Sequence, residues 1–146
     1  MSSAFSSSND QTRRIPSDSD CPCLSGSEYG SCCEPYLSRA AEPPTAEACM
    51  RSRYTAYVLR DADHLFRTWH PSTRPDDMGL SAVSWSGLSI EKTYQGGQLD
   101  DMGQVEFRAQ WKLEDGVRAE LHEVSNFHRL NGRWLYLSGE HHFHTR

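Results

Sequence analysis

Four cysteines near the amino end of the chain have the residue type and spacing of a metal site. The chain holds five cysteines among 146 residues, and four of them fall within residues 21–33 in the pattern C-x-C-x8-C-C. Zinc prefers four tetrahedral ligands, and thiolates bind it at about 2.3 Å. The spacing therefore predicts one zinc ion held by Cys21, Cys23, Cys32 and Cys33. Because four protein ligands leave no open coordination position, we expect this zinc to be structural.

The same thiols have two other interpretations, as free or disulfide-bonded cysteines and as a redox site. The cluster lacks the C-x-x-C motif and the βαβ context that are typical of redox sites. The first 20 residues contain no apolar stretch of a secretory signal, and Arg13-Arg14 precedes Pro16 instead of the apolar run of a twin-arginine signal. We therefore expect a cytoplasmic chain with reduced thiols, which favours metal. Cys49 is expected in a helix as a small core residue.

A second group of residues could form a ligand site or an acid–base site. Counting by two along a predicted strand from Val117 through Leu121 reaches Glu123 and Ser125, which would share the inner face. A buried carboxylate needs a partner, or its pKa rises. Arg53 is our first choice, because a guanidinium binds a carboxylate through two hydrogen bonds. The other basic candidates on the predicted helices are Arg51, His64, Arg67 and His70.

Both a structural and a functional interpretation remain open for these residues. Glu123 could hold the helices on the sheet through an ion pair, or it could act as acid or base with Arg53 or His70. Aromatic side chains could line a ligand cavity, although such rings more often pack in the core. The candidate ligand-binding residues are Arg53, Trp69, Ser125 and Trp134, with Trp111 and Tyr136 as further cavity rings. A C-terminal histidine cluster is more often adventitious than a metal site; it comprises His141, His142 and His144.

Two helices are predicted ahead of the strands. Thr45 is a favourable N-cap, and an apolar stripe follows at the i, i+4, i+7, i+8 spacing of a buried helix face: Met50, Tyr54, Tyr57 and Val58. Asp61 is a second N-cap, before a short helix that Pro71 ends. The apolar side of this second helix is expected to comprise Leu65, Phe66 and Trp69.

The rest of the chain changes to the two-residue period of strands. The clearest alternation runs from Val105 to Leu113, and an earlier strand is predicted around Leu88. Asp115-Gly116 and Asn131-Gly132 are hairpin signals. About four antiparallel strands after two helices indicate an α+β fold, with helices packed on one face of a curved antiparallel sheet.

The predicted organisation is a disordered tail at 1–20, a zinc knuckle and linker at 21–44, an α+β domain at 45–140 and a tail at 141–146. We expect the α+β domain to fold without the first 44 residues. Fifteen basic and twenty acidic residues give a net charge of 15 − 20 = −5, which argues against non-specific nucleic-acid binding. No apolar run approaches the roughly 20 residues of a membrane span.

The cysteine segment resembles the SEC-C motif, a zinc motif also found at the C-terminus of the SecA translocation motor. Three further stretches are similar to the bacterial YchJ-like family: residues 50–54 (MRSRY), 61–63 (DAD) and 68–71 (TWHP). Trp85, Gly87-Leu88 and Glu123-x-Ser125-x-Phe127 also fit, so the resemblance covers about residues 21–139. It implies a nuclear-transport-factor-2-like (NTF2-like) domain, a cone of curved sheet closed by helices.

Three positions depart from that resemblance. Leu24 stands where the SEC-C motif usually has glycine, Glu28 where a basic residue is common, and residues 140–146 (EHHFHTR) where many relatives have a second cysteine motif. The cysteine spacing is untouched, so zinc is still expected, but a basic partner-binding face is not. We predict a zinc-containing module that binds a protein partner through the knuckle or a small ligand in the cone cavity. The alternative is a small enzyme that uses Glu123 with a histidine or an arginine.

Overall fold

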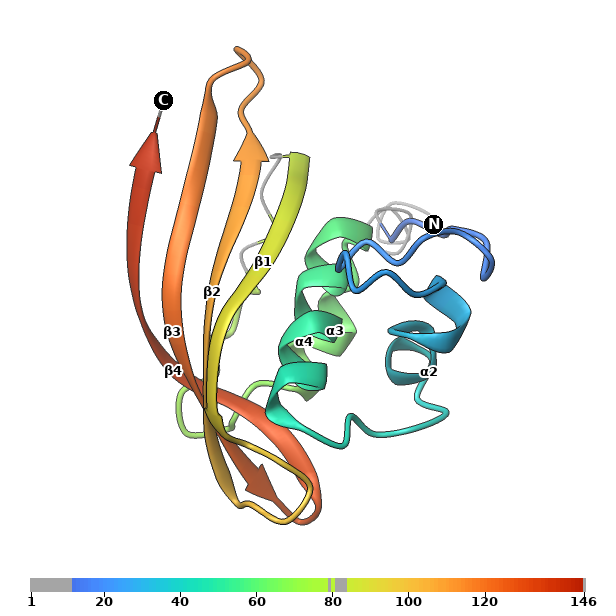
Figure 1. The fold of residues 1–146 in the computed structure, drawn as a ribbon, viewed down its shortest axis with the longest axis vertical. Helices are drawn as coiled ribbons and strands as arrows, with labels where there is room; N and C mark the ends of the chain where they lie inside the picture. Colours follow the sequence, from blue (N-terminus) through green and yellow to red (C-terminus); the bar gives the residue numbers. More distant parts are fainter. Residues whose placement is uncertain (1–11, 79, 81–83, 146) are drawn as a thin grey trace, which may run out of the picture.

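The computed structural model describes residues 12–78, 80 and 84–145. Its elements in chain order are the 3₁₀ helix η1 (Tyr29–Ser31), the helices α2 (Glu34–Leu37), α3 (Ala46–Leu59) and α4 (Ala62–Arg67), and the strands β1 (Ser84–Gln95), β2 (Met102–Lys112), β3 (Arg118–Leu130) and β4 (Arg133–Thr145). The four strands form one curved sheet, and the helices lie against its concave face (Figure 1). The predicted α+β class, with helices before strands, is confirmed.

The sheet is an antiparallel meander in the order β1-β2-β3-β4. Leu130 pairs with Arg133, so β3 and β4 are joined by a two-residue loop, Asn131-Gly132. Both loop residues have positive φ, 53° and 79°, as a type I′ turn requires. Gly116 also has a positive φ, 86°, in the turn between β2 and β3. Both predicted hairpins are therefore present.

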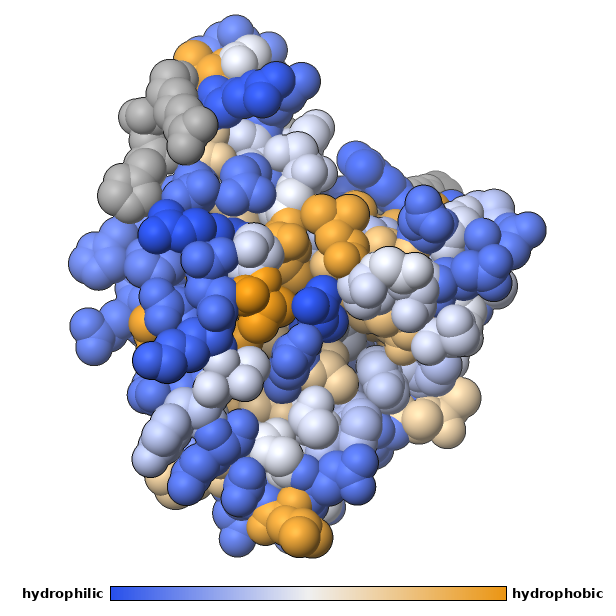
Figure 2. Space-filling model, in the orientation of Figure 1, coloured by the Kyte–Doolittle hydropathy of each residue, from blue (hydrophilic) through white to orange (hydrophobic). Residues whose placement is uncertain are grey.

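The inner row of the sheet follows the predicted alternation. Val105, Phe107 and Ala109 on β2 are buried, and Phe107 lies opposite Glu123 on β3. The outer side of the sheet carries polar networks such as Arg108 with Glu120. On the face shown in Figure 2, apolar surface is concentrated between the sheet and the helices, and the outer side of the sheet is largely hydrophilic.

Helix α3 is buried on two sides. Thr45 caps it by accepting a hydrogen bond from the Ala48 amide at 3.1 Å, as predicted. Met50 and Tyr54 belong to the core over the sheet, but Ser52, Thr55 and Ala56 are also fully buried. These small residues let a second layer approach, which consists of the cysteine segment and α4. Cys21, Cys23 and Cys33 accordingly belong to the same core cluster as Phe107, Phe127 and Trp134.

The predicted disordered tail is wrong for its second half, whereas residues 1–11 lie outside the described chain. The Arg13 amide donates to the Leu59 carbonyl at 2.6 Å, and Tyr29 and Gly30 donate to the Ser19 and Ser17 carbonyls at 2.7 Å. Ile15 packs against the core. The segment is ordered by these long-range contacts, which its polar composition does not reveal.

Two other predictions also differ from the structure. The expected tail at 141–146 is wrong, because β4 pairs with β3 as far as Thr145. Phe66 does not join the apolar side of α4; it is 43% exposed and lies under the guanidinium of Arg74. Asp61 caps α4 as predicted, by accepting from the His64 amide at 3.1 Å. Within the described residues, no helix is long and apolar enough to cross a bilayer.

Candidate functional site

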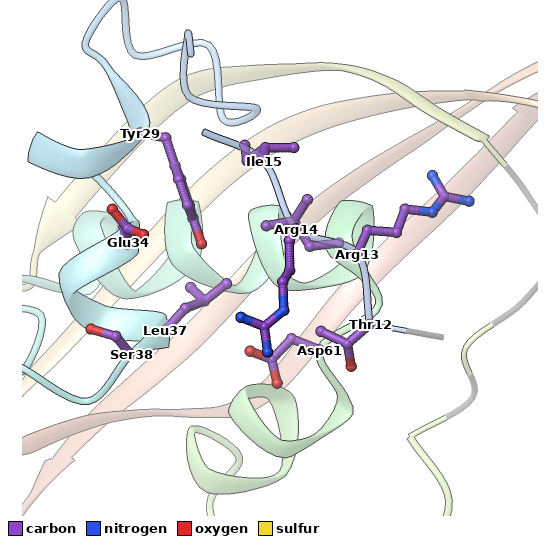
Figure 3. Close-up of a pocket in the computed structure, with 10 residues that line it drawn as sticks. Thr12, Arg13, Arg14, Ile15, Tyr29, Glu34, Leu37, Ser38 and Asp61 are labelled. Carbon is purple, nitrogen blue, oxygen red and sulfur yellow. The ribbon is translucent and has the colours of Figure 1, made fainter. Parts of the chain in front are cut away.

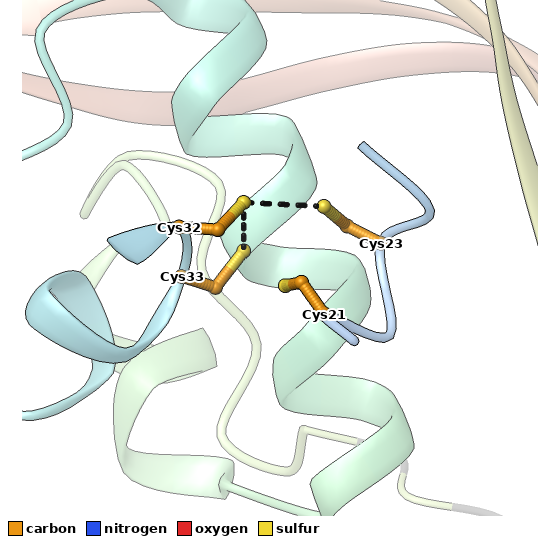
Figure 4. Close-up of side chains that lie close together, drawn as sticks. All are labelled: Cys21, Cys23, Cys32 and Cys33. Atoms are coloured by element: carbon orange, nitrogen blue, oxygen red, sulfur yellow. Dashed lines mark hydrogen bonds between the residues drawn. The ribbon is translucent and has the colours of Figure 1, made fainter. Parts of the chain in front are cut away.

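Two short backbone segments bring the four cysteines together. The first is a tight turn in which the Leu24 amide donates to the Cys21 carbonyl at 3.0 Å and the Cys21 amide donates to Ser27 at 2.9 Å. Gly26, with a φ of 93°, completes the reversal of the chain. The second segment lies between η1 and α2, where Cys33 is the N-cap residue of α2. Figure 4 shows both segments directing their thiols toward one point beside α3.

The sulfur atoms have the spacing of a tetrahedral metal site. All four lie within 4.8 Å of one another, and Cys23 and Cys32 are 3.6 Å apart, with 3.9 Å between Cys32 and Cys33. Ligands at about 2.3 Å in a tetrahedron lie about 3.8 Å apart, so the donor set fits zinc. All five cysteines of the chain are free thiols. The structure thus places Cys21, Cys23, Cys32 and Cys33 together, as the spacing predicts.

The thiols are held by a surrounding set of hydrogen bonds. Ser25 lies 3.1 Å from the Cys32 sulfur, and Thr55 on α3 donates to the Cys33 sulfur at 3.4 Å. Arg51, also on α3, donates to the Cys23 carbonyl at 3.0 Å and lies 3.8 Å from the Cys23 sulfur. A guanidinium at this distance offsets the excess negative charge of four thiolates around a divalent cation. Helix α3 is therefore the platform on which the cysteine segment is fixed.

The thiols differ in acidity because they share protons within a buried cluster. Hydrogen bonds with Cys21 and Cys33 lower the pKa of Cys23. Hydrogen bonds with Cys21 and Cys23 instead raise the pKa of Cys33. Burial raises the pKa of Cys32 to about 11. A bound cation displaces such shared protons, so the cluster is suited to a metal that binds thiolates.

Cys49 is separate from the cluster and is structural. It is fully buried in α3, its sulfur donates to the Trp134 carbonyl at 3.5 Å, and burial raises the pKa of its thiol to about 12. A thiol in such surroundings is inert. The predicted role of Cys49 as a small core residue agrees with this placement.

Glu123 faces inward from β3, as the two-residue period predicts. It is 9% exposed and accepts a short hydrogen bond from the Ser125 hydroxyl. The Tyr136 hydroxyl on β4 also hydrogen-bonds this carboxylate, and burial followed by the charge of Glu123 raises the pKa of Tyr136. Gly139 makes the approach possible, because a Cβ there would lie 2.8 Å from the Glu123 carboxyl carbon and 3.0 Å from the Tyr136 oxygen.

The prediction that Arg53 pairs with Glu123 is wrong. Arg53 donates to the Leu65 carbonyl at 3.1 Å and to the Thr68 hydroxyl at 2.8 Å. Its guanidinium lies over two rings, 4.9 Å from that of Trp69 and 4.8 Å from that of Tyr136. Among the described residues, the basic group nearest the Glu123 carboxylate is instead His141, with its Nδ1 at 3.8 Å.

The other candidate residues have different environments. Trp134 is 1% exposed and donates from Nε1 to the Pro44 carbonyl at 3.2 Å, so it is core. Trp69 contacts Tyr136 at a ring distance of 5.1 Å, and its buried Nε1 has no hydrogen-bond partner among the described residues. The His70 Nδ1 accepts from the Ser72 amide at 3.1 Å, so this histidine is engaged with its own turn.

Sequence reasoning missed His141 and Gly139 as parts of this group. The period of β4 alone does not place them there, because counting by two from Tyr136 reaches Ser138 and Glu140. A register shift between Asn126 and Phe127 on β3 pairs His141 with Glu123 and Gly139 with Ser125 instead. His64 was considered only as a partner for Glu123. It is in fact fully buried between α3 and α4, with its Nε2 2.8 Å from the Ser52 hydroxyl, and burial lowers its pKa to about 3.

Comparison with known proteins shows which family has this sequence and architecture. The family described as "YchJ, middle NTF2-like domain" matches residues 45–139. The chain belongs to the YchJ-like family. It is 48% identical to a UPF0225 protein of Chromobacterium violaceum over 82% of this chain and 90% of the relative. It is 44% identical to a UPF0225 protein of Deinococcus radiodurans, over 80% and 85%. The resemblance drawn from the sequence is thereby confirmed.

Solved structures agree with the family assignment. A SEC-C motif containing protein from Rhodopseudomonas palustris has a TM-score of 0.74 and 34% identity, covering 82% of this chain and 96% of that one. A sec-c motif containing protein from Psychrobacter arcticus has a TM-score of 0.70 and 27% identity, covering 84% and 82%. This YchJ-like chain therefore combines a SEC-C-type cysteine cluster with an NTF2-like domain.

Proposed function

We propose that this YchJ-like protein is a zinc-containing binding module of the cytoplasm. Cys21, Cys23, Cys32 and Cys33 would hold one structural zinc ion, and the observation that carries this is the tetrahedral spacing of their sulfurs within 4.8 Å. Bound zinc would supply a cross-link between the two backbone segments. A reducing compartment is required to keep the thiols available to the metal.

Elemental analysis of tag-free, reduced protein tests the zinc assignment. We expect about one zinc per chain, which Cys32→Ser should abolish because three thiolates bind more weakly. Cys49→Ala is the matched control, since this thiol lies outside the cluster, and it should retain the metal. Less than about 0.3 equivalents in wild-type protein purified without chelator would rule the assignment out.

Leu24 supports a protein partner at the zinc knuckle. It is 59% exposed, and its φ of 62° is a left-handed conformation that usually requires glycine. A leucine held there exposes apolar surface at a cost of about 1 kcal/mol in backbone strain. We infer that its side chain contacts an apolar group of the partner. A partner that binds wild-type protein should no longer bind Leu24→Asp. It should still bind Leu99→Asp, the control at a second exposed leucine.

The inner face of the sheet supports a second candidate, a small-ligand or acid–base site at Glu123. The carboxylate lies beside Ser125, Tyr136 and His141, and within the described chain no arginine or lysine pairs with it. The Nε1 of Trp69, which has no partner in the part of the chain that the structure describes, is a further donor on this side. If Glu123 serves function, Glu123→Gln should leave the melting temperature unchanged or raise it. A fall of several degrees, with Glu91→Gln neutral, would assign the carboxylate a structural role.

A further inference from the structure

A cavity lies on the opposite side of α3 from the sheet, between the amino-terminal segment and the zinc knuckle. Its volume is about 410 Å³, within the range of small-molecule sites. Three parts of the chain line it: residues 12–15, the knuckle with α2, and the junction of α3 with α4 (Figure 3). Pockets at such junctions are frequent ligand sites. This cavity is separate from both the cysteine cluster and the Glu123 group.

Tyr29 provides a polar group that faces this cavity. The residue is 7% exposed, and Figure 3 shows its hydroxyl directed into the space between Leu37 and Arg14. Within the described chain, no hydrogen bond reaches this hydroxyl. The hydroxyl is open to the cavity and is not sealed from solvent, so it is available to hydrogen-bond a ligand there. Burial, reinforced by the charge of Glu34, raises the pKa of Tyr29 to about 12, so the phenol keeps its proton and can donate.

The charged groups of the cavity are of both signs. Arg14 extends along the cavity with its guanidinium beside Asp61, whereas Arg13 points away (Figure 3). Asp61 uses one carboxylate oxygen to cap α4, and Glu34 accepts from Ser17 at 2.6 Å, so each has one oxygen left. Among the described residues Arg14 forms no ion pair within 4.0 Å. One guanidinium and two carboxylates thus face the same small space.

The remaining wall of the cavity is apolar. Ile15, Leu37 and Leu59 line it, and Ile15 and Leu37 are half-buried against the core. Apolar walls provide affinity, and a few converging polar groups provide orientation. A ligand that satisfies this set has an apolar body, an anionic group for Arg14 and a cationic group for the carboxylates.

We propose that this cavity binds a small zwitterion with an apolar side chain, of the class of the apolar α-amino acids. The ligand carboxylate would pair with Arg14, its ammonium group with Asp61 or Glu34, and its side chain would lie against Leu37 and Ile15. The Tyr29 hydroxyl would donate to the ligand carboxylate. This inference goes beyond the zinc-containing module and does not depend on the zinc assignment.

Calorimetric titration of the full-length protein with L-leucine tests the proposal, with two analogues as matched probes. Leucinamide keeps the ammonium group without the carboxylate, and N-acetyl-leucine keeps the carboxylate without the ammonium group. We expect leucine to bind and each analogue to bind at least about tenfold more weakly, because a charge-assisted contact is lost. Arg14→Gln should weaken leucine binding about tenfold, and Tyr29→Phe about fivefold. Tyr94→Phe, at an exposed tyrosine far along the chain, should leave binding unchanged.

Three outcomes would overturn the proposal. Absence of leucine binding is the first, and equal affinity for leucine and leucinamide is the second, since Arg14 would then recognise nothing. Unchanged leucine affinity in both Arg14→Gln and Tyr29→Phe is the third, because the ligand would then bind elsewhere. Zinc content and the melting temperature of each variant are measured in parallel, so a folding defect or a failed zinc assignment is recognised separately.

Discussion

Thr55 donates a hydrogen bond from α3 to the sulfur of Cys33 at 3.4 Å, and its hydroxyl lies 3.8 Å from the sulfur of Cys21. One side chain of the NTF2-like domain therefore contacts one cysteine from each of the two knuckle segments. Thr55 is fully buried, so its hydroxyl depends on protein groups for its hydrogen bonds. The cysteine cluster and the folded domain are coupled through this residue.

Thr55→Val should weaken metal retention while preserving the shape of the side chain. Groups that hydrogen-bond metal ligands typically contribute about 10-fold to 100-fold in affinity. We expect zinc to pass to a competing chelator at about tenfold lower chelator concentration than for wild type. Thr93→Val, at an exposed threonine on β1, is the control. Equal retention in both variants would show that Thr55 does not position the thiols.

Removal of residues 1–42 should leave a folded but less stable domain. The sheet and the side of α3 that faces it keep their mutual contacts, whereas Ser52, Thr55 and Ala56 lose the layer that covers them. We expect a cooperative thermal transition at least about 5 °C below that of the full chain, since each 1 kcal/mol shifts a domain of this size by several degrees. Circular dichroism during heating is the measurement. Absence of any cooperative transition would show that the knuckle is essential to the core.

The features that the sequence predicted correctly are those determined by neighbouring residues. The caps at Thr45 and Asp61 and the turn at Asn131-Gly132 depend on side chains and φ angles within a few positions. The inward direction of Glu123 follows from the strand period alone. The cysteine cluster was also predictable, because a metal site of this kind is built from two close pairs.

The features that the sequence did not predict depend on contacts between distant segments. Arg53 does not pair with Glu123, because it donates to the Leu65 carbonyl and its guanidinium lies over the rings of Trp69 and Tyr136. Residues 12–20 are ordered by backbone partners as far away as Leu59. A shift in pairing between β3 and β4 after Asn126 sets which β4 residues face Glu123, and local propensity does not determine such a shift.

His64 should make the stability of the protein fall between pH 6.5 and pH 3. Burial lowers its pKa from 6.5 to about 3, with Arg67 and Arg53 adding to the effect. Above pH 6.5 both the folded and the unfolded states hold a neutral imidazole. Below it the unfolded chain takes up a proton that the folded chain excludes, so the free energy of unfolding falls with pH.

The loss attributable to His64 is about 1 kcal/mol between pH 7 and pH 5.5. His64→Gln keeps an amide donor for Ser52 without a titrating group, and it should remove this part of the pH dependence. His128→Gln is a control at a partly exposed histidine. Denaturant unfolding at the two pH values measures the difference. An identical pH dependence in wild type and His64→Gln would contradict the assignment.

Gly139→Ala should destabilise the protein through the Glu123 carboxylate. The new Cβ would lie 2.8 Å from the Glu123 carboxyl carbon, which requires a neighbouring atom to shift. It would also lie 3.0 Å from the Tyr136 oxygen, which is tighter than most real Cβ contacts. Overpacking of this kind costs about 1–3 kcal/mol. Gly97→Ala is the matched control, because a Cβ there meets only an Asp100 oxygen at an ordinary 3.5 Å.

If the Glu123 carboxylate is the cause of the loss in Gly139→Ala, Glu123→Ala should relieve much of the clash. The double variant Gly139→Ala with Glu123→Ala should then be more stable than the sum of the single effects. Additive losses in urea unfolding would show that Gly139 is required for another reason.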